Sequence, residues 1–266
     1  MSTNNHEHLV EELKNIKIAI ATTDLSEAQT SAFMIRIEEI LIATRFTHQQ
    51  EEEIIASFGS TLYPYYEKYI FEPTVVQEKE ILNQLLEAEY PNFHTIHTRG
   101  LLYNKFPKLV KDEISSLDIT SENKVAFIGS GPFPLTALLY HYYSGATVHC
   151  IESSHQSCVE SRALITALGL DDCILVIESA GEDLQDESYD LVAVAAQAHP
   201  REIILNHLAN VLKPTVNVLF RTQTGLGVIL DEPESNVSKN VLRQFIFSHE
   251  VLREDGMMKS LVYEVK

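Results

Sequence analysis

A glycine turn near the middle of the chain has the residue types needed to hold a small molecule. The turn begins at Gly129, directly after the apolar run VAFI, and reads GSGPFPLT. Glycines at Gly129 and Gly131, with Ser130 between them, would let a ligand touch backbone amides that side chains otherwise shield. At the start of a helix, such a turn attracts a carboxylate or a phosphate. The pattern therefore predicts a ligand-binding turn.

Glu152 indicates which ligand the turn would hold. It ends the next expected strand, 23 positions after Gly129, where an acidic side chain accepts the two hydroxyls of an adenosine ribose. Enzymes that use nicotinamide dinucleotides and enzymes that use S-adenosylmethionine share this arrangement. A dinucleotide fold favours a third glycine where this chain has Pro134, so S-adenosylmethionine, which has no phosphate, is the better prediction. A structural turn with a solvated Glu152 is the alternative.

The turn lies in a region where strand and helix patterns alternate. The segments are KVAFIG and PLTALLYHYY, TVHCIES and QSCVESRALITALG, CILVIES, YDLVAVAAQA and REIILNHLANVL, and finally NVLFRTQ. Strands that alternate with helices predict a parallel sheet with right-handed crossovers. The last segments, LRQFIFSHEVL and KSLVYEV, predict a closing hairpin. We therefore expect an α/β fold, with a Rossmann-like domain over residues 121–266.

The first part of the chain has a helical pattern instead. Apolar residues recur at spacings of three and four in LVEELKNIKIAI, FMIRIEEILIATRF and EKEILNQLLEAEY, with acidic residues on the opposite faces. Ser26 and Thr47 precede such runs and are expected to cap helices. We therefore expect an N-terminal helical domain over residues 1–120.

Composition and charge narrow the class of partner. The chain has 266 residues, 45% of them hydrophobic, enough for one large domain or a domain with an appendage. Its net charge of −18 would repel nucleic acids and anionic membranes. No apolar stretch reaches the ~18 residues of a membrane span, and the acidic start is unlike a signal peptide. We expect a cytoplasmic protein that acts on small molecules.

The cysteines do not predict a metal site. They are odd in number and show no CxxC spacing, so buried reduced thiols are expected. No histidine pair is accompanied by a third ligand at a suitable spacing. The cysteines are Cys150, Cys158 and Cys173.

The two prolines of the turn resemble a feature of one enzyme family. FIGSGPFPLTALLY is similar to the signature of the nicotianamine synthase family, whose turn has the form GSGPLPLT or GGGPLPLT. YDLVAVAAQAHP and VLFRTQTGLGVILDEP are similar to two later segments of the family. The resemblance covers residues 124–233 well and the helical half loosely. Gly227 and Asp231 depart from it, since the family often has arginine and an aromatic residue there.

The resemblance implies a reaction other than methylation. Family members let an amine attack the methylene carbon beside the sulfur of S-adenosylmethionine, which moves the 3-amino-3-carboxypropyl (aminobutanoyl) group and releases methylthioadenosine. A stiff turn suits this reaction, because attack at one of three electrophilic carbons requires a rigidly held aminobutyrate arm.

The resemblance also implies an acceptor. Bacterial relatives in opine-type metallophore pathways attach one aminobutanoyl group to histidine, and a dehydrogenase then completes the chelator. We therefore expect histidine as the acceptor and an opine-type dehydrogenase downstream. The alternatives are a nicotianamine synthase in the strict sense, a conventional methyltransferase and, ranked last, a nicotinamide dehydrogenase.

Several residues outside the turn are candidates for the chemistry. The resemblance places a general base on the helical domain, at Glu78 or Glu80 in VVQEKEILNQLL, with a solvated helix face as the alternative for each. It also implies that Tyr103 orients the substrate, with core packing as the alternative. Arg221 follows a strand and could clamp a substrate carboxylate, with a surface ion pair as the alternative. His199 borders the expected cleft or caps the next helix.

The expected contacts to S-adenosylmethionine, the co-substrate, come from the turn, the start of its helix and the ends of the later strands. They are Gly129, Ser130, Gly131, Pro134, Leu135, Thr136, Glu152, Ala180, Ala195 and Gln197.

Overall fold

The computed structural model describes residues 3–22, 25–43, 46–59, 61–88, 106–185, 188–230 and 237–266. The chain divides into two compact units. The first comprises Met1–Gln77, Gln223–Glu234 and Asp255–Met258, and the second comprises Glu78–Thr222, Ser235–Glu254 and Lys259–Lys266. This division differs from the expected boundary between residues 120 and 121, because two later segments of the chain pack among the N-terminal helices.

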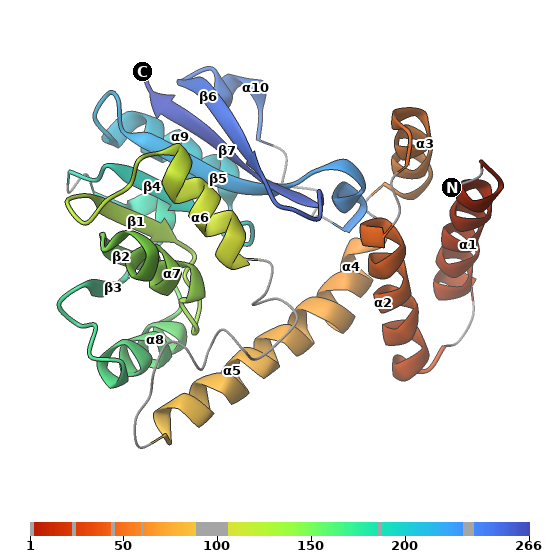
Figure 1. Cartoon of the computed structure of the whole chain (residues 1–266), viewed down its shortest axis with the longest axis horizontal. Coiled ribbons are helices and arrows are strands. Elements are labelled where there is room, and N and C mark those ends of the chain that lie inside the picture. Colours follow the sequence, from red (N-terminus) through yellow and green to blue (C-terminus); the bar gives the residue numbers. More distant parts are fainter. Residues whose placement is uncertain are drawn as a thin grey trace. The chain divides into compact units, whose positions relative to one another are not determined.

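The first unit is helical, as its sequence pattern predicts (Figure 1). Its elements are α1 (Thr3–Thr22), α2 (Glu27–Ala43), α3 (His48–Phe58), α4 (Tyr63–Tyr66), the π-helix η1 (Glu67–Phe71) and the first part of α5 (Glu72–Leu86). The predicted cap at Thr47 is confirmed, because its side chain accepts a hydrogen bond from the amide of Gln50 in a capping box. Ser26 makes the corresponding pair of hydrogen bonds with Gln29.

The core of the first unit contains residues from both ends of the chain. Leu13, Ile37 and Ile54 from the first three helices are buried in one cluster with Ile229 of the 3₁₀ helix η4 (Gly225–Leu230). Nearby, a Cβ atom on Gly227 would lie 2.3 Å from the carbonyl oxygen of Met257. This contact leaves no room for a side chain at Gly227, one of the two positions that depart from the family pattern.

The second unit contains a seven-stranded sheet in the order β3-β2-β1-β4-β5-β7-β6. Its strands are β1 (Lys124–Ile128), β2 (Thr147–Glu152), β3 (Ile174–Glu178), β4 (Leu191–Val194), β5 (Asn217–Gln223), β6 (Phe245–Leu252) and β7 (Met258–Val265). The first five strands pair in parallel, and β6 and β7 form an antiparallel pair. The predicted α/β fold with a closing hairpin is therefore confirmed.

Helices cover both faces of this sheet (Figure 1). They are α6 (Phe106–Ser116), α7 (Leu135–Ser144), α8 (His155–Ala167), α9 (Arg201–Val211), α10 (Lys239–Leu242) and the 3₁₀ helix η3 (Gly181–Asp183). Alternate residues of each strand point to opposite faces, so Val125 and Phe127 enter one core cluster while Ala126 and Ile128 enter the other. None of the described helices is both long and apolar enough to cross a membrane.

The second half of α5 packs on the α/β unit. Leu82 and Leu85 are buried in the same core cluster as residues of α6, α7 and β1. The exposed Asn83 lies between them on the opposite side of the helix. This part of α5 therefore contributes hydrophobic stabilisation to the second unit.

Replacing Leu82 with alanine should lower the free energy of unfolding by about 2–5 kcal/mol, because the change removes buried methyl groups and leaves a cavity. Asn83→Ala is the matched control and should change it by no more than about 0.5 kcal/mol. Urea unfolding followed by circular dichroism measures both values. Equal stabilities for the two variants would contradict the packing of α5 on this core.

Candidate functional site

The glycine turn connects β1 to α7 in a backbone conformation that favours glycine. Gly129 and Gly131 have φ angles of +79° and +67°, which side-chain-bearing residues rarely adopt. A Cβ atom on Gly129 would lie 3.0 Å from the Cβ of Ala198 and 3.3 Å from that of Ala195. At Gly131 no atom of the described chain lies within 4 Å of the corresponding position. The turn is therefore tightly packed at its first glycine and open at its second.

Glu152 is bound to this turn. Its side chain is buried, its Oε2 accepts a hydrogen bond of 2.8 Å from the amide of Gly131, and its Oε1 accepts one of 2.9 Å from the amide of Ser154. The alternative of a solvated Glu152 is therefore wrong. Each carboxylate oxygen has two lone pairs, so the group can fix the turn and still accept hydroxyl groups of a ligand.

The start of α7 presents backbone amides that no side chain caps. Pro134 occupies the N-cap position, and no side-chain hydrogen bond is made there. The amide of Leu135 donates to the carbonyl of Phe133 at 2.7 Å. The amides of Thr136 and Ala137, which follow it in the first turn, have no partner within the helix, and such amides attract negative charge. The buried hydroxyl of Ser130 lies beside this helix start and next to the thiol of Cys150. These donors fit a carboxylate, and the open side of Gly131 leaves room for it.

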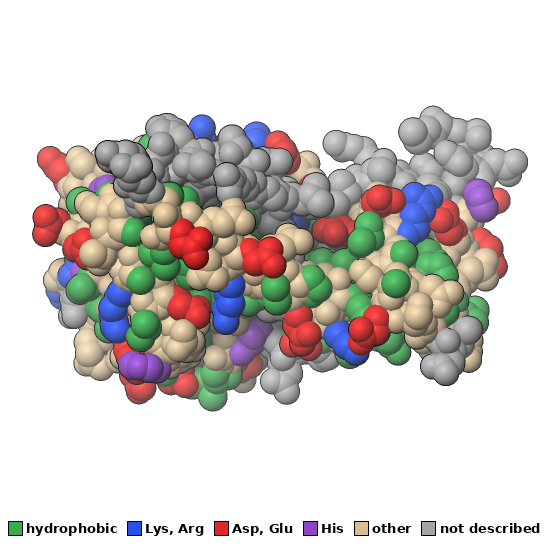
Figure 2. Space-filling view, turned by 90° about the horizontal axis from the view of Figure 1, so that it is seen from below, with side chains coloured by type: hydrophobic (Ala, Val, Ile, Leu, Met, Phe, Trp, Pro, Cys, Tyr) green, Lys and Arg blue, Asp and Glu red, His purple; other side chains and the backbone are tan. Residues whose placement is uncertain are grey.

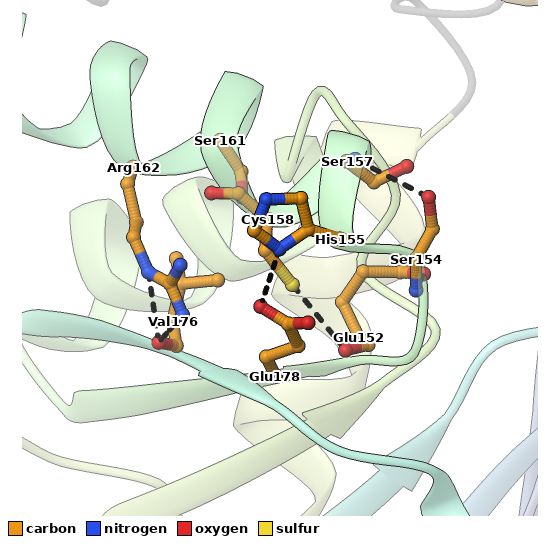
Figure 3. Close-up of polar contacts among 9 residues, drawn as sticks. All are labelled: Glu152, Ser154, His155, Ser157, Cys158, Ser161, Arg162, Val176 and Glu178. Atoms are coloured by element: carbon orange, nitrogen blue, oxygen red, sulfur yellow. Dashed lines mark hydrogen bonds and ion pairs between the residues drawn. The ribbon is translucent and has the colours of Figure 1, made fainter.

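The neighbouring strand end has a different arrangement (Figure 3). Glu178 pairs in register with Glu152 across β2 and β3. Its carboxylate is partly exposed and lies 2.9 Å from the Nδ1 atom of His155. Ser154 caps α8 by accepting a hydrogen bond from the amide of Ser157. Of the two paired carboxylates, Glu152 is therefore the one that reaches the glycine turn.

Among the predicted cofactor contacts at the later strand ends, Ala195 packs against the glycine turn. Ala195 packs beside Gly129 and donates its amide to the carbonyl of Ile128 at 3.0 Å. Ala180 is half-buried before η3, and Gln197 is exposed. Their predicted contacts to a cofactor stay predictions.

His199 is exposed at the same edge of the sheet. Pro200 occupies the N-cap position of α9 and makes no capping hydrogen bond. Both roles considered for His199, at the cleft and at the helix start, stay predictions.

Arg221 is buried instead of lying at the surface. Its Nε and Nη2 atoms donate to the two carboxylate oxygens of Glu113, at 3.0 and 2.9 Å, and its Nη1 donates to Thr136 at 3.0 Å. The alternative of a surface ion pair is therefore wrong. Each of these hydrogen bonds joins Arg221 to another residue of the protein. The predicted clamp of Arg221 on a substrate carboxylate therefore stays a prediction.

Sequence reasoning did not identify Glu113. It lies in FPKLVKDEISS, where it is one of four charged residues among eleven. One signal was present, because Glu113 occupies the apolar stripe that Phe106, Leu109, Val110 and Ile114 define at helical spacing. A carboxylate within such a stripe indicates a buried partner of opposite charge.

The two candidate bases lie in different environments. Glu78 is half-buried, and burial raises its pKa to about 7. Glu80 is exposed. A carboxyl group with a pKa near 7 is suited to accept a proton at neutral pH. Tyr103 lies outside the described residues.

The cysteines are buried or half-buried, and charges of both signs share one face of the molecule. Burial raises the pKa of Cys150 to about 12 and also raises that of Cys158, so both are inert thiols, whereas Cys173 is half-buried. The described residues contain no group of side chains that could hold a metal ion. Figure 2 shows acidic side chains dispersed over one face, with lysine and arginine among them and no basic patch there.

Comparisons with known proteins agree on one family and one fold. The family model described as nicotianamine synthase protein matches residues 2–245. L-histidine 2-aminobutanoyltransferase from Yersinia pestis is 28% identical over 128 residues, which cover 48% of each protein. The chain thus matches about half the length of that curated relative.

Two crystal structures of MtNAS share the fold. A glutamate-to-glutamine variant in complex with S-adenosylmethionine matches with a TM-score of 0.81 and 21% identity over 96% of this chain and 97% of that chain. The complex of MtNAS with MTA and tNA matches with a TM-score of 0.78 and 20% identity over 99% and 97%.

Replacing Glu152 with alanine should weaken the binding of S-adenosylmethionine by about tenfold to a hundredfold, because a hydrogen bond to a charged group contributes about 1.5–3 kcal/mol. Glu178→Ala, at the paired position on β3, is the matched control and should change the affinity less than about threefold. Isothermal titration calorimetry measures both. Unchanged affinity in Glu152→Ala would exclude Glu152 from the site.

Proposed function

This chain belongs to the nicotianamine synthase family, and from that premise we propose that it transfers the aminobutanoyl group of S-adenosylmethionine to histidine and releases methylthioadenosine. The observation that carries the proposal is the turn before α7, which the buried Glu152 holds through the amide of Gly131. The two prolines of the turn indicated the nicotianamine synthase family, and the match of the family model over residues 2–245 confirms this prediction.

S-adenosylmethionine fits the residues around this turn. Glu152 would accept the ribose hydroxyls, while Ser130 and the first amides of α7 would donate to the carboxylate of the amino acid end. When bound, the co-substrate supplies an electrophilic methylene carbon beside its sulfonium. A related fold, that of MtNAS, has been solved with S-adenosylmethionine, which supports the same ligand here.

Histidine is the acceptor that the relatives support. The Yersinia pestis protein is named as an L-histidine 2-aminobutanoyltransferase, and its match with this chain covers 48% of each. Transfer of one group to histidine would supply a precursor for metallophore synthesis. A cytoplasmic location and a downstream opine-type dehydrogenase stay predictions, as do the roles of Tyr103 and His199 in binding the substrate.

We assign the general base to Glu78. In the transfer, the amine nitrogen forms a bond to the methylene carbon, the bond from that carbon to sulfur breaks, and its electron pair leaves with methylthioadenosine. The nitrogen must also lose a proton, which the Glu78 carboxylate would accept. Glu80 is the competing assignment, and its exposure makes it the weaker one.

Incubation of the protein with S-adenosylmethionine and histidine should yield methylthioadenosine and a conjugate heavier than histidine by one aminobutyrate unit. Liquid chromatography with mass spectrometry measures both products, with each histidine enantiomer and without histidine. S-adenosylhomocysteine as the product would make the protein a methyltransferase. Nicotianamine formed at an equal rate without histidine would make it a nicotianamine synthase in the strict sense.

Glu78→Gln should lower kcat by about 100-fold or more and leave the affinity for S-adenosylmethionine nearly unchanged, because a base acts on the chemical step. In the unaltered protein, kcat should fall about tenfold per pH unit below 7, since burial raises the pKa of Glu78 to about 7 and only the carboxylate accepts a proton. Steady-state kinetics from pH 5 to 9 measure this. If Glu80→Gln lowers kcat by this factor and Glu78→Gln does not, Glu80 is the general base.

A further inference from the structure

Five buried polar residues form a network that includes Thr136 in the first turn of α7, and we call it the Glu113 network. Glu113 lies at its centre, on α6, and is completely buried. Its carboxylate accepts hydrogen bonds from Tyr140 on α7, Arg221 on β5 and Ser260 on β7. Arg221 in turn donates to Thr136 on α7. The network thus joins two helices that cover one face of the sheet to two strands within it.

The guanidinium group of Arg221 is fixed from several sides. It forms a bidentate pair with Glu113 and packs over the rings of Phe106 and Phe127, with its Cζ atom 5.4 and 5.7 Å from their centroids. Burial lowers the pKa of Arg221, but the charge and hydrogen bonds of Glu113, together with Tyr140, outweigh this effect, so the net shift is upward. A planar fork held in this way directs its remaining donors to fixed positions.

One of those donors reaches the predicted ligand site. Thr136 lies in the first turn of α7, two residues after Pro134, and its Oγ1 accepts a hydrogen bond of 3.0 Å from Nη1 of Arg221. Since a guanidinium group cannot accept a hydrogen bond, the proton of the Thr136 hydroxyl must be donated elsewhere. Within the described chain no hydrogen bond takes up this proton.

Stability alone does not account for the Glu113 network. Buried ion pairs can often be replaced by apolar residues at little cost, whereas removing one partner leaves a buried charge unpaired. Tyr140 and Ser260 add neutral donors to Glu113, and both hydroxyl groups donate to this carboxylate instead of to the turn. The contact from Arg221 to Thr136 is therefore the part of the network that bears on the ligand.

We propose that Arg221 is a positioning residue, which orients the Thr136 hydroxyl so that it donates to the carboxylate of the aminobutanoyl arm. Glu113 serves as the fixed counter-charge that holds Arg221 in place. This inference rests on the proposed binding of S-adenosylmethionine at the turn, and it replaces a direct clamp by Arg221 on the substrate.

Calorimetric titration with S-adenosylmethionine tests the inference. Arg221→Lys keeps the charge but loses the fork, and it should raise Kd about tenfold. Thr136→Val should raise Kd to a similar extent, and Thr136→Ser, which keeps the hydroxyl, should restore it to within about threefold. In the double variant, Thr136→Val should add no further loss to Arg221→Lys, because both changes remove one linked contact.

Ser260→Ala is the matched control, since it removes a donor to Glu113 from β7 and leaves the hydrogen bond between Arg221 and Thr136 in place. It should lower the melting temperature and leave Kd within about threefold. If the losses of Arg221→Lys and Thr136→Val multiply, or if either folded single variant retains the original Kd, Arg221 does not act through Thr136.

Binding and product identity separate this inference from the proposed function. Release of S-adenosylhomocysteine by the unaltered protein would refute aminobutanoyl transfer and leave the binding result standing. Absence of S-adenosylmethionine binding in the unaltered protein would overturn both.

Discussion

The buried ion pair between Glu113 and Arg221 is the interaction on which the α/β unit depends. Both side chains are almost fully buried, at 0% and 3% exposure, so each has lost its hydration. Such a loss is compensated only if every lone pair and proton finds a partner with good geometry. Glu113 meets this condition through donors from three elements. One carboxylate therefore links α6, on which it lies, to α7, β5 and β7.

Three carboxylates of the second unit differ in the interactions that compensate for their lost hydration. Arg221 neutralises the charge of Glu113, whereas Glu152 receives two backbone amides, from Gly131 and Ser154. Glu78 is half-buried, and its pKa is raised by desolvation. A paired charge suits a structural centre, an amide-bound carboxylate suits hydroxyl recognition, and a carboxylate with a raised pKa suits proton transfer.

The local parts of this arrangement could be predicted from the sequence. The turn and Glu152 are separated by one helix and follow a βαβ pattern, so spacing alone placed them at the same edge of the sheet. The closing hairpin was also visible in its strand patterns. The pair of Glu113 with Arg221 was not, because its members are 108 positions apart and only the folded sheet brings them together.

The unit boundaries show a second limit of local patterns. Ile229 and Met257 belong to segments near strands, yet they are buried with the N-terminal helices.

The sequence also could not decide which of Glu78 and Glu80 is the base, because both lie in one acidic helical run. Their exposure depends on which residues pack against α5, and periodicity does not specify these neighbours.

The close packing at Gly129 has a consequence for the evolution of this site. A Cβ atom there would meet Ala198 at 3.0 Å and Ala195 at 3.3 Å, so the clearance of the turn depends on three small residues together. A larger side chain at either alanine would press on the glycine backbone, and no substitution at the glycine could relieve the pressure. These positions are therefore epistatic: each limits which mutations the others tolerate. Directed evolution toward new acceptors has more freedom elsewhere in the chain than in this trio.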